Sequence, residues 1–132
     1  MRQGCLERSR KVSLNTRSRG TFYEDTACEY LKKQGVVILQ RNFRCRMGEI
    51  DIIARDGDCI VFAEVKYRKN TACGDALAAV GFAKQKKICR CAMIYCMYHP
   101  QVTRIRYDVI GITDTKIEWI KDAFEHIGYS WQ

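Results

Sequence analysis

The feature that most restricts the fold of this 132-residue chain is a pair of apolar segments joined by a tight turn. Residues 49–55 and 59–68 are rich in Ile, Val and Phe, residue types that favour strands. Asp56-Gly57 lies between them and is a dipeptide typical of hairpin turns. We therefore predict two antiparallel strands that form a hairpin.

The predicted hairpin brings acidic and basic side chains to one face. Pairing Arg55 with Asp58 across the turn places Asp51 diagonal to Glu64, about 7 to 8 Å apart at their backbones. Because side chains alternate along a strand, Asp51, Glu64 and Lys66 project to the same side. Two carboxylates at this spacing can bind one cation such as Mg2+. The alternative is that Glu64 and Lys66 form an ordinary ion pair at a solvated strand end.

The other segments predict a mixed sheet with helices packed on it. Apolar residues recur at helical spacing over 22–34 and 75–98, and Pro100 ends the second helix. Short apolar or alternating segments predict three further strands, and the tail is expected to be a short helix or coil. These strands cover 36–44, 104–112 and 116–120.

Glu24 has two interpretations. Thr21-Phe22-Tyr23-Glu24 matches a capping box, in which the Glu24 carboxylate bonds back to the Thr21 amide at the start of a helix. Glu24 also shares a helix face with Ala27 and Leu31, so its carboxylate can point toward a buried site. The residues alone leave both interpretations open.

The charge of the chain favours a polyanionic partner. Lys and Arg number 23 and Asp and Glu 15, which gives a net charge of +8. Residues 1–19 carry a net +5 of this, lack aromatic residues and show no sustained periodicity. We predict a basic flexible arm over 1–19 and a single domain over 20–132, with a merely solubilising tail as the alternative.

No apolar stretch approaches the roughly 18 residues of a membrane span, and the basic N-terminus is followed by polar residues instead of a signal sequence. We therefore expect a cytoplasmic protein without a membrane partner. Its eight cysteines should then stay reduced, and their spacing, with only His99 and His126 as nitrogen ligands, does not fit a zinc site. We interpret them as small apolar filler, with a redox-sensing thiol as the alternative.

Basic residues gather near the predicted hairpin and along the long helix. Contacts with phosphate groups are their expected use, although a charged helix surface is often only solvated. Phe43 and Tyr67 could stack on bases, but packing in the core is the favoured interpretation. The basic residues are Arg41, Arg44, Arg46, Arg68, Lys69, Lys84, Lys86, Lys87 and Arg90.

The chain resembles the small bacterial YraN-like family in Gly48-Glu49-Ile50-Asp51 and Phe62-Ala63-Glu64-Val65-Lys66. The resemblance spans residues 20–124 and includes Lys84-Gln85 and Tyr107-Asp108-Val109. That family is assigned to the restriction-endonuclease-like superfamily of PD-(D/E)XK nucleases and is similar to archaeal Holliday-junction resolvases. The implied fold is α/β, a mixed central sheet flanked by helices with an αβββαβ core.

The resemblance also implies roles for individual residues. Asp51, Glu64 and Glu24 would be metal ligands, Lys66 the catalytic lysine, and Gln85 a helical glutamine near the site. The expected function is a metal-dependent endonuclease, using Mg2+ or Mn2+, that hydrolyses phosphodiesters in DNA or structured nucleic acid. The alternative is a catalytically silent nucleic-acid-binding module of the same fold. A protein-interaction adaptor is a third candidate, and it would show no salt-sensitive nucleic-acid binding. The resemblance makes DNA the expected partner, whereas the residues themselves do not distinguish DNA from RNA and leave a homodimer open.

Overall fold

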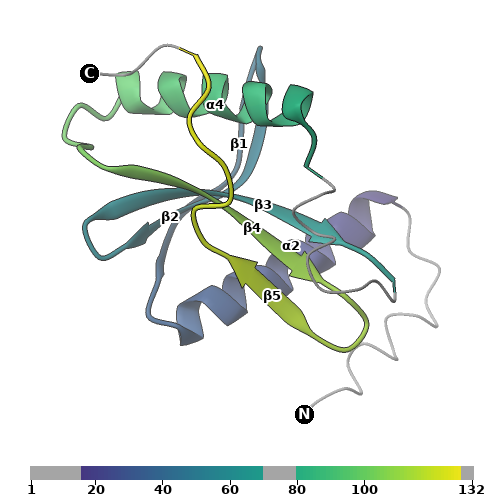
Figure 1. The fold of residues 1–132 in the computed structure, drawn as a ribbon. Coiled ribbons are helices and arrows are strands. Elements are labelled where there is room, and N and C mark those ends of the chain that lie inside the picture. The colour runs from purple at the N-terminus through teal and green to yellow at the C-terminus, as the bar shows by residue number, and fades with distance from the viewer. Residues whose placement is uncertain (1–15, 70–79, 129–132) are drawn as a thin grey trace.

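The computed structural model describes residues 16–69 and 80–128, in which two helices enclose a five-stranded sheet (Figure 1). The strands lie in the order β1-β2-β3-β4-β5, with β3 and β4 parallel and the other neighbours antiparallel. This α/β architecture confirms the predicted fold class and is consistent with a restriction-endonuclease-like fold. The elements are α2 Thr16–Lys33, β1 Val37–Cys45, β2 Gly48–Asp56, β3 Cys59–Tyr67, α4 Phe82–Met97, β4 Ile105–Ile112 and β5 Ile117–Ile120.

The helices cover opposite faces of the sheet, α4 on one and α2 on the other (Figure 1). The first six residues of β3 are buried, because side chains on both of its faces meet a helix layer. Phe62 packs under α4 with Ile88 and Tyr95, whereas Val61 packs under α2 with Leu31. The described helices include none that is long and apolar enough to cross a membrane.

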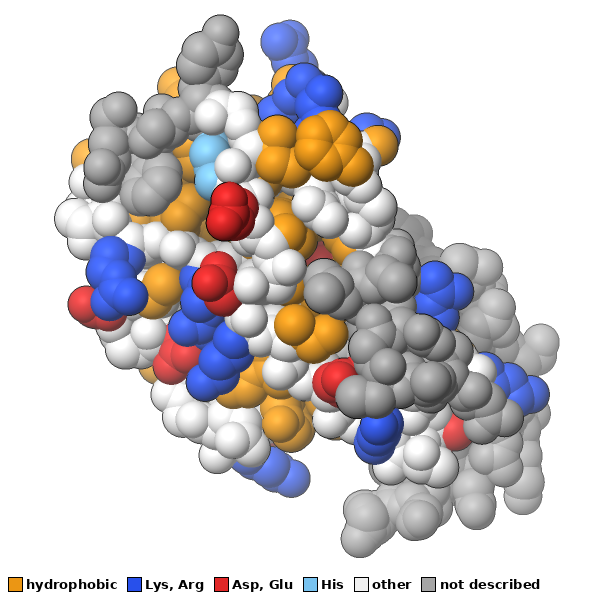
Figure 2. Space-filling view, viewed as in Figure 1, with side chains coloured by type: hydrophobic (Ala, Val, Ile, Leu, Met, Phe, Trp, Pro, Cys, Tyr) orange, Lys and Arg blue, Asp and Glu red, His pale blue; other side chains and the backbone are white. Residues whose placement is uncertain are grey.

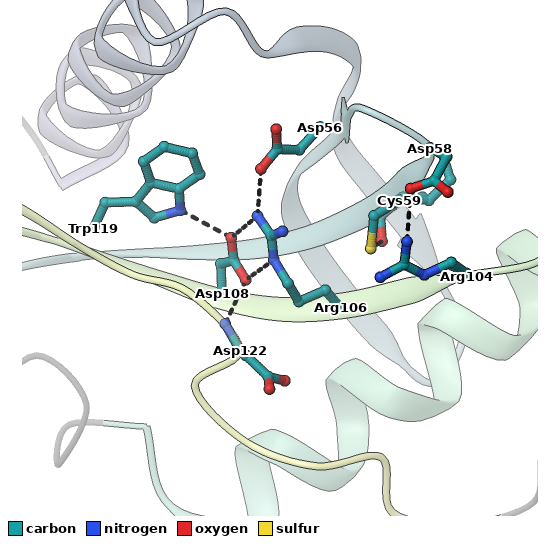
Figure 3. Close-up of polar contacts among 9 residues, drawn as sticks. Asp56, Asp58, Cys59, Arg104, Arg106, Asp108, Trp119 and Asp122 are labelled. Atoms are coloured by element: carbon teal, nitrogen blue, oxygen red, sulfur yellow. Dashed lines mark hydrogen bonds and ion pairs between the residues drawn. The ribbon is translucent and has the colours of Figure 1, made fainter.

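A buried ion pair holds β4 to its neighbours (Figure 3). Asp108, 0% exposed, accepts two hydrogen bonds from the Arg106 guanidinium, both at 2.9 Å. It accepts two more, from the Trp119 indole at 2.8 Å and the Asp122 amide at 2.9 Å. Arg106 also bonds Asp56, the last residue of β2, at 2.9 Å. The hairpin, β4, β5 and the chain after β5 are therefore linked through the Arg106–Asp108 ion pair.

The predicted hairpin forms, but its register was wrong by two residues. Arg55 pairs with Ile60 instead of Asp58, and the turn residues are Gly57-Asp58 instead of Asp56-Gly57. Gly57 has the positive φ, 66°, that a type II′ turn requires at its first central residue. Because side chains repeat every two residues, this even shift keeps the paired residues, 52–56 and 59–63, on their predicted faces.

The first helix begins earlier than predicted. Thr21 lies inside α2, which starts at Thr16, so the capping-box interpretation of Glu24 is wrong. Residues 16–19 of the predicted arm are helical, and residues 1–15 lie outside the described residues. The polar start of α2 has no apolar periodicity that could have revealed it.

The second half of the chain matches its predicted elements with small shifts. Helix α4 starts at Phe82, after Gly81, and the part of the predicted helix over 75–79 lies outside the described residues, as do residues 70–74. Residues 121–128 contain neither helix nor strand, so the coil alternative for this part of the tail is confirmed.

Gly48, the first residue of β2, provides a test of how β2 meets α4. Its φ is +149°, and an added Cβ would lie 3.4 Å from the Lys87 Cβ and 3.6 Å from the Cys91 Sγ. We predict that Gly48→Ala lowers the free energy of unfolding by about 1 to 3 kcal/mol, measured by chemical denaturation. Gly20→Ala is the control: Gly20 lies in α2 with open space around it, so alanine should raise helix stability by up to about 1 kcal/mol. A neutral Gly48→Ala would contradict the proposed strain.

Candidate metal and nucleic-acid site

The candidate site lies where β2 and β3 stop pairing. Their backbone ladder runs from Asp56 and Cys59 as far as Ile52 and Ala63. Beyond that point the Val65 amide donates a hydrogen bond to the Asp51 carboxylate, at 2.9 Å. A side chain thus replaces the neighbouring strand as the partner of a backbone donor. The hairpin end opposite the turn is therefore open to side chains from other elements.

Both core clusters extend to this part of β2. Ile50 packs in the core under α4 and Ile52 in the core under α2, although residues two apart in a regular strand share a face. The pairing register of β1 with β2 is nevertheless constant from Ile53 to Gly48. Asn42, level with Asp51 on β1, has a left-handed φ of 54°, a conformation that asparagine tolerates.

Glu64 is the buried centre of the site. Its side chain is 5% exposed, and its Oε2 lies 3.6 Å from the Lys66 Nζ and 3.4 Å from the Lys84 Nζ. Its Oε1 is buried and has no hydrogen-bond partner among the described residues. Since burying an unpartnered carboxylate oxygen costs free energy, this atom is suited to bind a proton or a cation.

Burial shifts the acidity of the central carboxyl groups. Desolvation, followed by the charge of Asp51, raises the pKa of Glu64 to about 7, although Lys84 and Lys66 oppose the rise. Desolvation also raises the pKa of Asp51, against the lowering effect of the Val65 amide. The charge of Asp51 acts on Glu64, so these two carboxyl groups lie close to each other.

Glu24 reaches the site from α2, and it does not cap that helix. Its side chain is 15% exposed, and burial, followed by the charge of Asp51, raises its pKa. Glu24, Glu49 and Asp51 each offer a carboxylate oxygen, and these atoms all lie within 4.8 Å of one another. An all-oxygen set of this kind fits Mg2+ or Mn2+. Glu49 was not among the predicted ligands, because its grouping with Glu24 depends on the packing of α2 against the sheet.

The predicted metal set is therefore divided in the structure. Glu24 and Asp51 group with Glu49, while Glu64 forms ion pairs with the two lysines and is influenced by the charge of Asp51. The Gln85 amide donates to the Val80 carbonyl at 2.9 Å, which fixes it at the start of α4. Its predicted catalytic role stays a prediction.

Three of the predicted phosphate-binding residues contact carboxylates. Arg41 lies 2.7 Å from Asp25 and 3.6 Å from Glu24, Arg44 lies 3.4 Å from Glu49, and Lys84 contacts Glu64. The Lys86 ammonium lies 5.7 Å from the centre of the Phe82 ring. The remaining predicted contacts are exposed: Arg46, Arg68, Lys69, Lys87 and Arg90.

The surface shown in Figure 2 carries Lys and Arg side chains dispersed among Asp and Glu. Phe43 packs edge-on against Tyr95, with ring centres 5.6 Å apart. Tyr67 stacks on Tyr23, with ring centres 4.2 Å apart. The favoured interpretation of both aromatics as packing residues agrees with these contacts.

Comparison with known proteins shows that the residues of the candidate site lie in a segment that this chain shares with a protein family. Residues 23–112 match the model of the Uncharacterised protein family UPF0102. A UPF0102 protein of Janthinobacterium sp. (strain Marseille) is 43% identical over 106 residues, which cover 80% of this chain and 86% of the relative. A UPF0102 protein of Lachnoclostridium phytofermentans is 41% identical over 117 residues, which cover 87% and 99%. All four carboxylates and both lysines of the site lie inside the matched segment.

The raised pKa of Glu64 gives a prediction about stability in buffer containing EDTA. The folded protein holds a proton on Glu64 up to about pH 7, whereas the unfolded chain releases it near 4.5. The free energy of unfolding should therefore fall as pH rises from 4.5 to about 7, by up to about 3 kcal/mol from this group. Glu64→Gln should remove that part of the slope in urea titrations at each pH. Glu29→Gln, which removes an exposed carboxylate on α2, is the control. Equal slopes in wild type and Glu64→Gln would contradict the assignment.

Proposed function

We propose that this chain, which belongs to the UPF0102 (YraN-like) family, is a metal-dependent nuclease that hydrolyses phosphodiesters in DNA or structured nucleic acid. The observation that supports this most is the meeting of four carboxylates and two ammonium groups where β2 and β3 diverge. A carboxylate cluster alone suits many cations. The two lysines beside it add the positive charge that an anionic phosphate requires.

The carboxylates and the lysines would have different roles in the reaction. Glu24, Glu49 and Asp51 would hold Mg2+ or Mn2+, with Glu64 beside them. When bound, such an ion supplies Lewis-acid stabilisation of the charge that develops on a phosphate. Lys66 and Lys84 contact the same oxygen of Glu64 from β3 and α4, so they would donate to a phosphate oxygen placed next to it.

Exposed basic side chains around the β1–β2 turn would bind the backbone of the nucleic acid. Gly48 lies against Lys87, so this turn packs on α4. Arg46 on the turn and Lys87 and Arg90 on α4 are exposed near that contact. Such residues bind phosphates without reading bases, and the net charge of +8 adds to this attraction.

Cleavage is the direct test of this function. The full chain should be incubated with linear, flapped and branched DNA and with matched RNA, in Mg2+ or Mn2+. We expect cleavage by wild type, and a loss of at least about 100-fold in Asp51→Ala and in Lys66→Ala. Asp58→Ala removes an exposed carboxylate from the other end of the same hairpin and should cleave like wild type.

Three outcomes would overturn the nuclease proposal. Cleavage that survives in Asp51→Ala would indicate a contaminating enzyme. Salt-sensitive binding of nucleic acid without metal-dependent cleavage of any substrate would support the silent binding module. Absence of both activities would favour the adaptor.

Binding in EDTA separates the two central residues. Asp51→Ala removes a negative charge that repels the backbone, so it should bind nucleic acid at least as tightly as wild type. Lys66→Ala removes an attraction and should bind several-fold more weakly. Calorimetry should show that uptake of Mn2+ is lost in Asp51→Ala and kept in Lys66→Ala. Loss of metal uptake in Lys66→Ala alone would reverse the assigned roles.

A further inference from the structure

Two cysteines on different elements face each other beside the β1–β2 turn. Cys45 is the last residue of β1, Cys91 lies in α4, and their sulfur atoms are 3.1 Å apart. The other described cysteines, Cys28, Cys59, Cys89 and Cys96, are buried. Cys5 and Cys73 lie outside the described residues. Cys45 and Cys91 thus make a dithiol pair, which packing in the core does not by itself require.

The turn holds the two sulfurs together. Gly48 brings β2 close to α4, so that a Cβ added there would lie 3.4 Å from the Lys87 Cβ and 3.6 Å from the Cys91 Sγ. The Met47 amide donates a hydrogen bond to the Cys45 sulfur at 3.3 Å. The S–S bond of a disulfide is about 2.05 Å long, so the sulfurs must approach by only about 1 Å.

The two thiols differ in access to solvent. Cys45 is partly exposed, whereas Cys91 is 0% exposed. Burial, followed by the hydrogen bond with Cys45, raises the pKa of Cys91 to about 12. A small oxidant from solvent therefore reaches Cys45 first, whereas the buried Cys91 next to it stays a protonated thiol.

We propose that Cys45 is a site of oxidation by hydroperoxides and that Cys91 is its resolving thiol. In the first step the Cys45 sulfur attacks the peroxide, the O–O bond breaks, and Cys45 becomes a sulfenic acid as one water or alcohol leaves. In the second step the Cys91 sulfur attacks the Cys45 sulfur. The S–O bond breaks, and the hydroxyl leaves with the Cys91 proton as water. Two thiols lose two electrons in total, and the peroxide gains them.

The Cys45–Cys91 disulfide would close a loop of the chain that contains residues of the candidate site. The chain from Cys45 to Cys91 contains β2 and β3 and therefore Glu49, Asp51 and Glu64. A cross-link over a loop of this length restricts the unfolded chain strongly, so oxidation should raise the Tm by several degrees. This inference concerns the thiols alone and does not depend on nuclease activity.

The test uses the full-length reduced protein and hydrogen peroxide at low molar excess. After treatment, free thiols are blocked, the protein is digested without reductant, and peptides are sequenced by tandem mass spectrometry. We expect a Cys45–Cys91 disulfide in wild type, reversed by dithiothreitol. Cys91→Ala should instead accumulate Cys45 sulfenic acid, trapped by dimedone.

Cys96→Ala is the matched control, since Cys96 is also buried in α4 and shares a tryptic peptide with Cys91. It should form the Cys45–Cys91 bond like wild type, whereas Cys45→Ser should form none at Cys91. The inference is overturned if both thiols are still alkylated after peroxide treatment of wild type. It is also overturned if Cys45 pairs with a different cysteine. Circular dichroism of each variant establishes that it is folded.

Discussion

The buried carboxylate of Asp108 is the interaction on which the arrangement of the sheet depends. A charge without access to water must be compensated, and Asp108 is compensated by the bidentate Arg106 guanidinium, the Trp119 indole and the Asp122 amide. These bonds hold β4 against β5, and the Arg106 bond to Asp56 ties β4 to the β2–β3 hairpin. Because β4 pairs with β3 over the whole of its length, the position of Glu64 is fixed by the same set of contacts.

Asp108 and Glu64 show two different ways of burying a carboxylate in one sheet. Asp108 has a hydrogen bond for each direction from which its oxygens can accept, so its burial serves the fold. Glu64 has two lysines on one oxygen and no partner among the described residues on the other. The same fold thus provides a complete set of hydrogen-bond donors for Asp108 and an incomplete set for Glu64. The incomplete shell around Glu64 therefore favours a role in binding over a role in stability.

The sequence predicted the strands well because their apolar segments are long and the hairpin turn contains a glycine. The hairpin keeps its predicted side-chain faces over the paired residues despite a register error, because an error of two residues leaves the faces unchanged. The sequence failed where tertiary contacts decide the outcome. Ile50 and Ile52 pack in different core clusters, and no local pattern encodes this. The grouping of Glu49 with Glu24 has the same origin, since α2 reaches the sheet only after folding.

The acidic cluster lowers the stability of the folded protein, and the packing of the core does not require it. Burial raises the pKa of Glu24, Asp51 and Glu64, so each carboxylate is less favourable when ionised in the folded protein than in the unfolded chain. The two core clusters that stabilise the sheet contain none of these three residues. Substitution by apolar or amide side chains could therefore relieve the cost without disturbing the core. The chain instead places two lysines beside Glu64, which offset part of this cost. Under the proposed function, a bound cation would offset the cost at the other carboxylates, and the lysines would then be available to a phosphate.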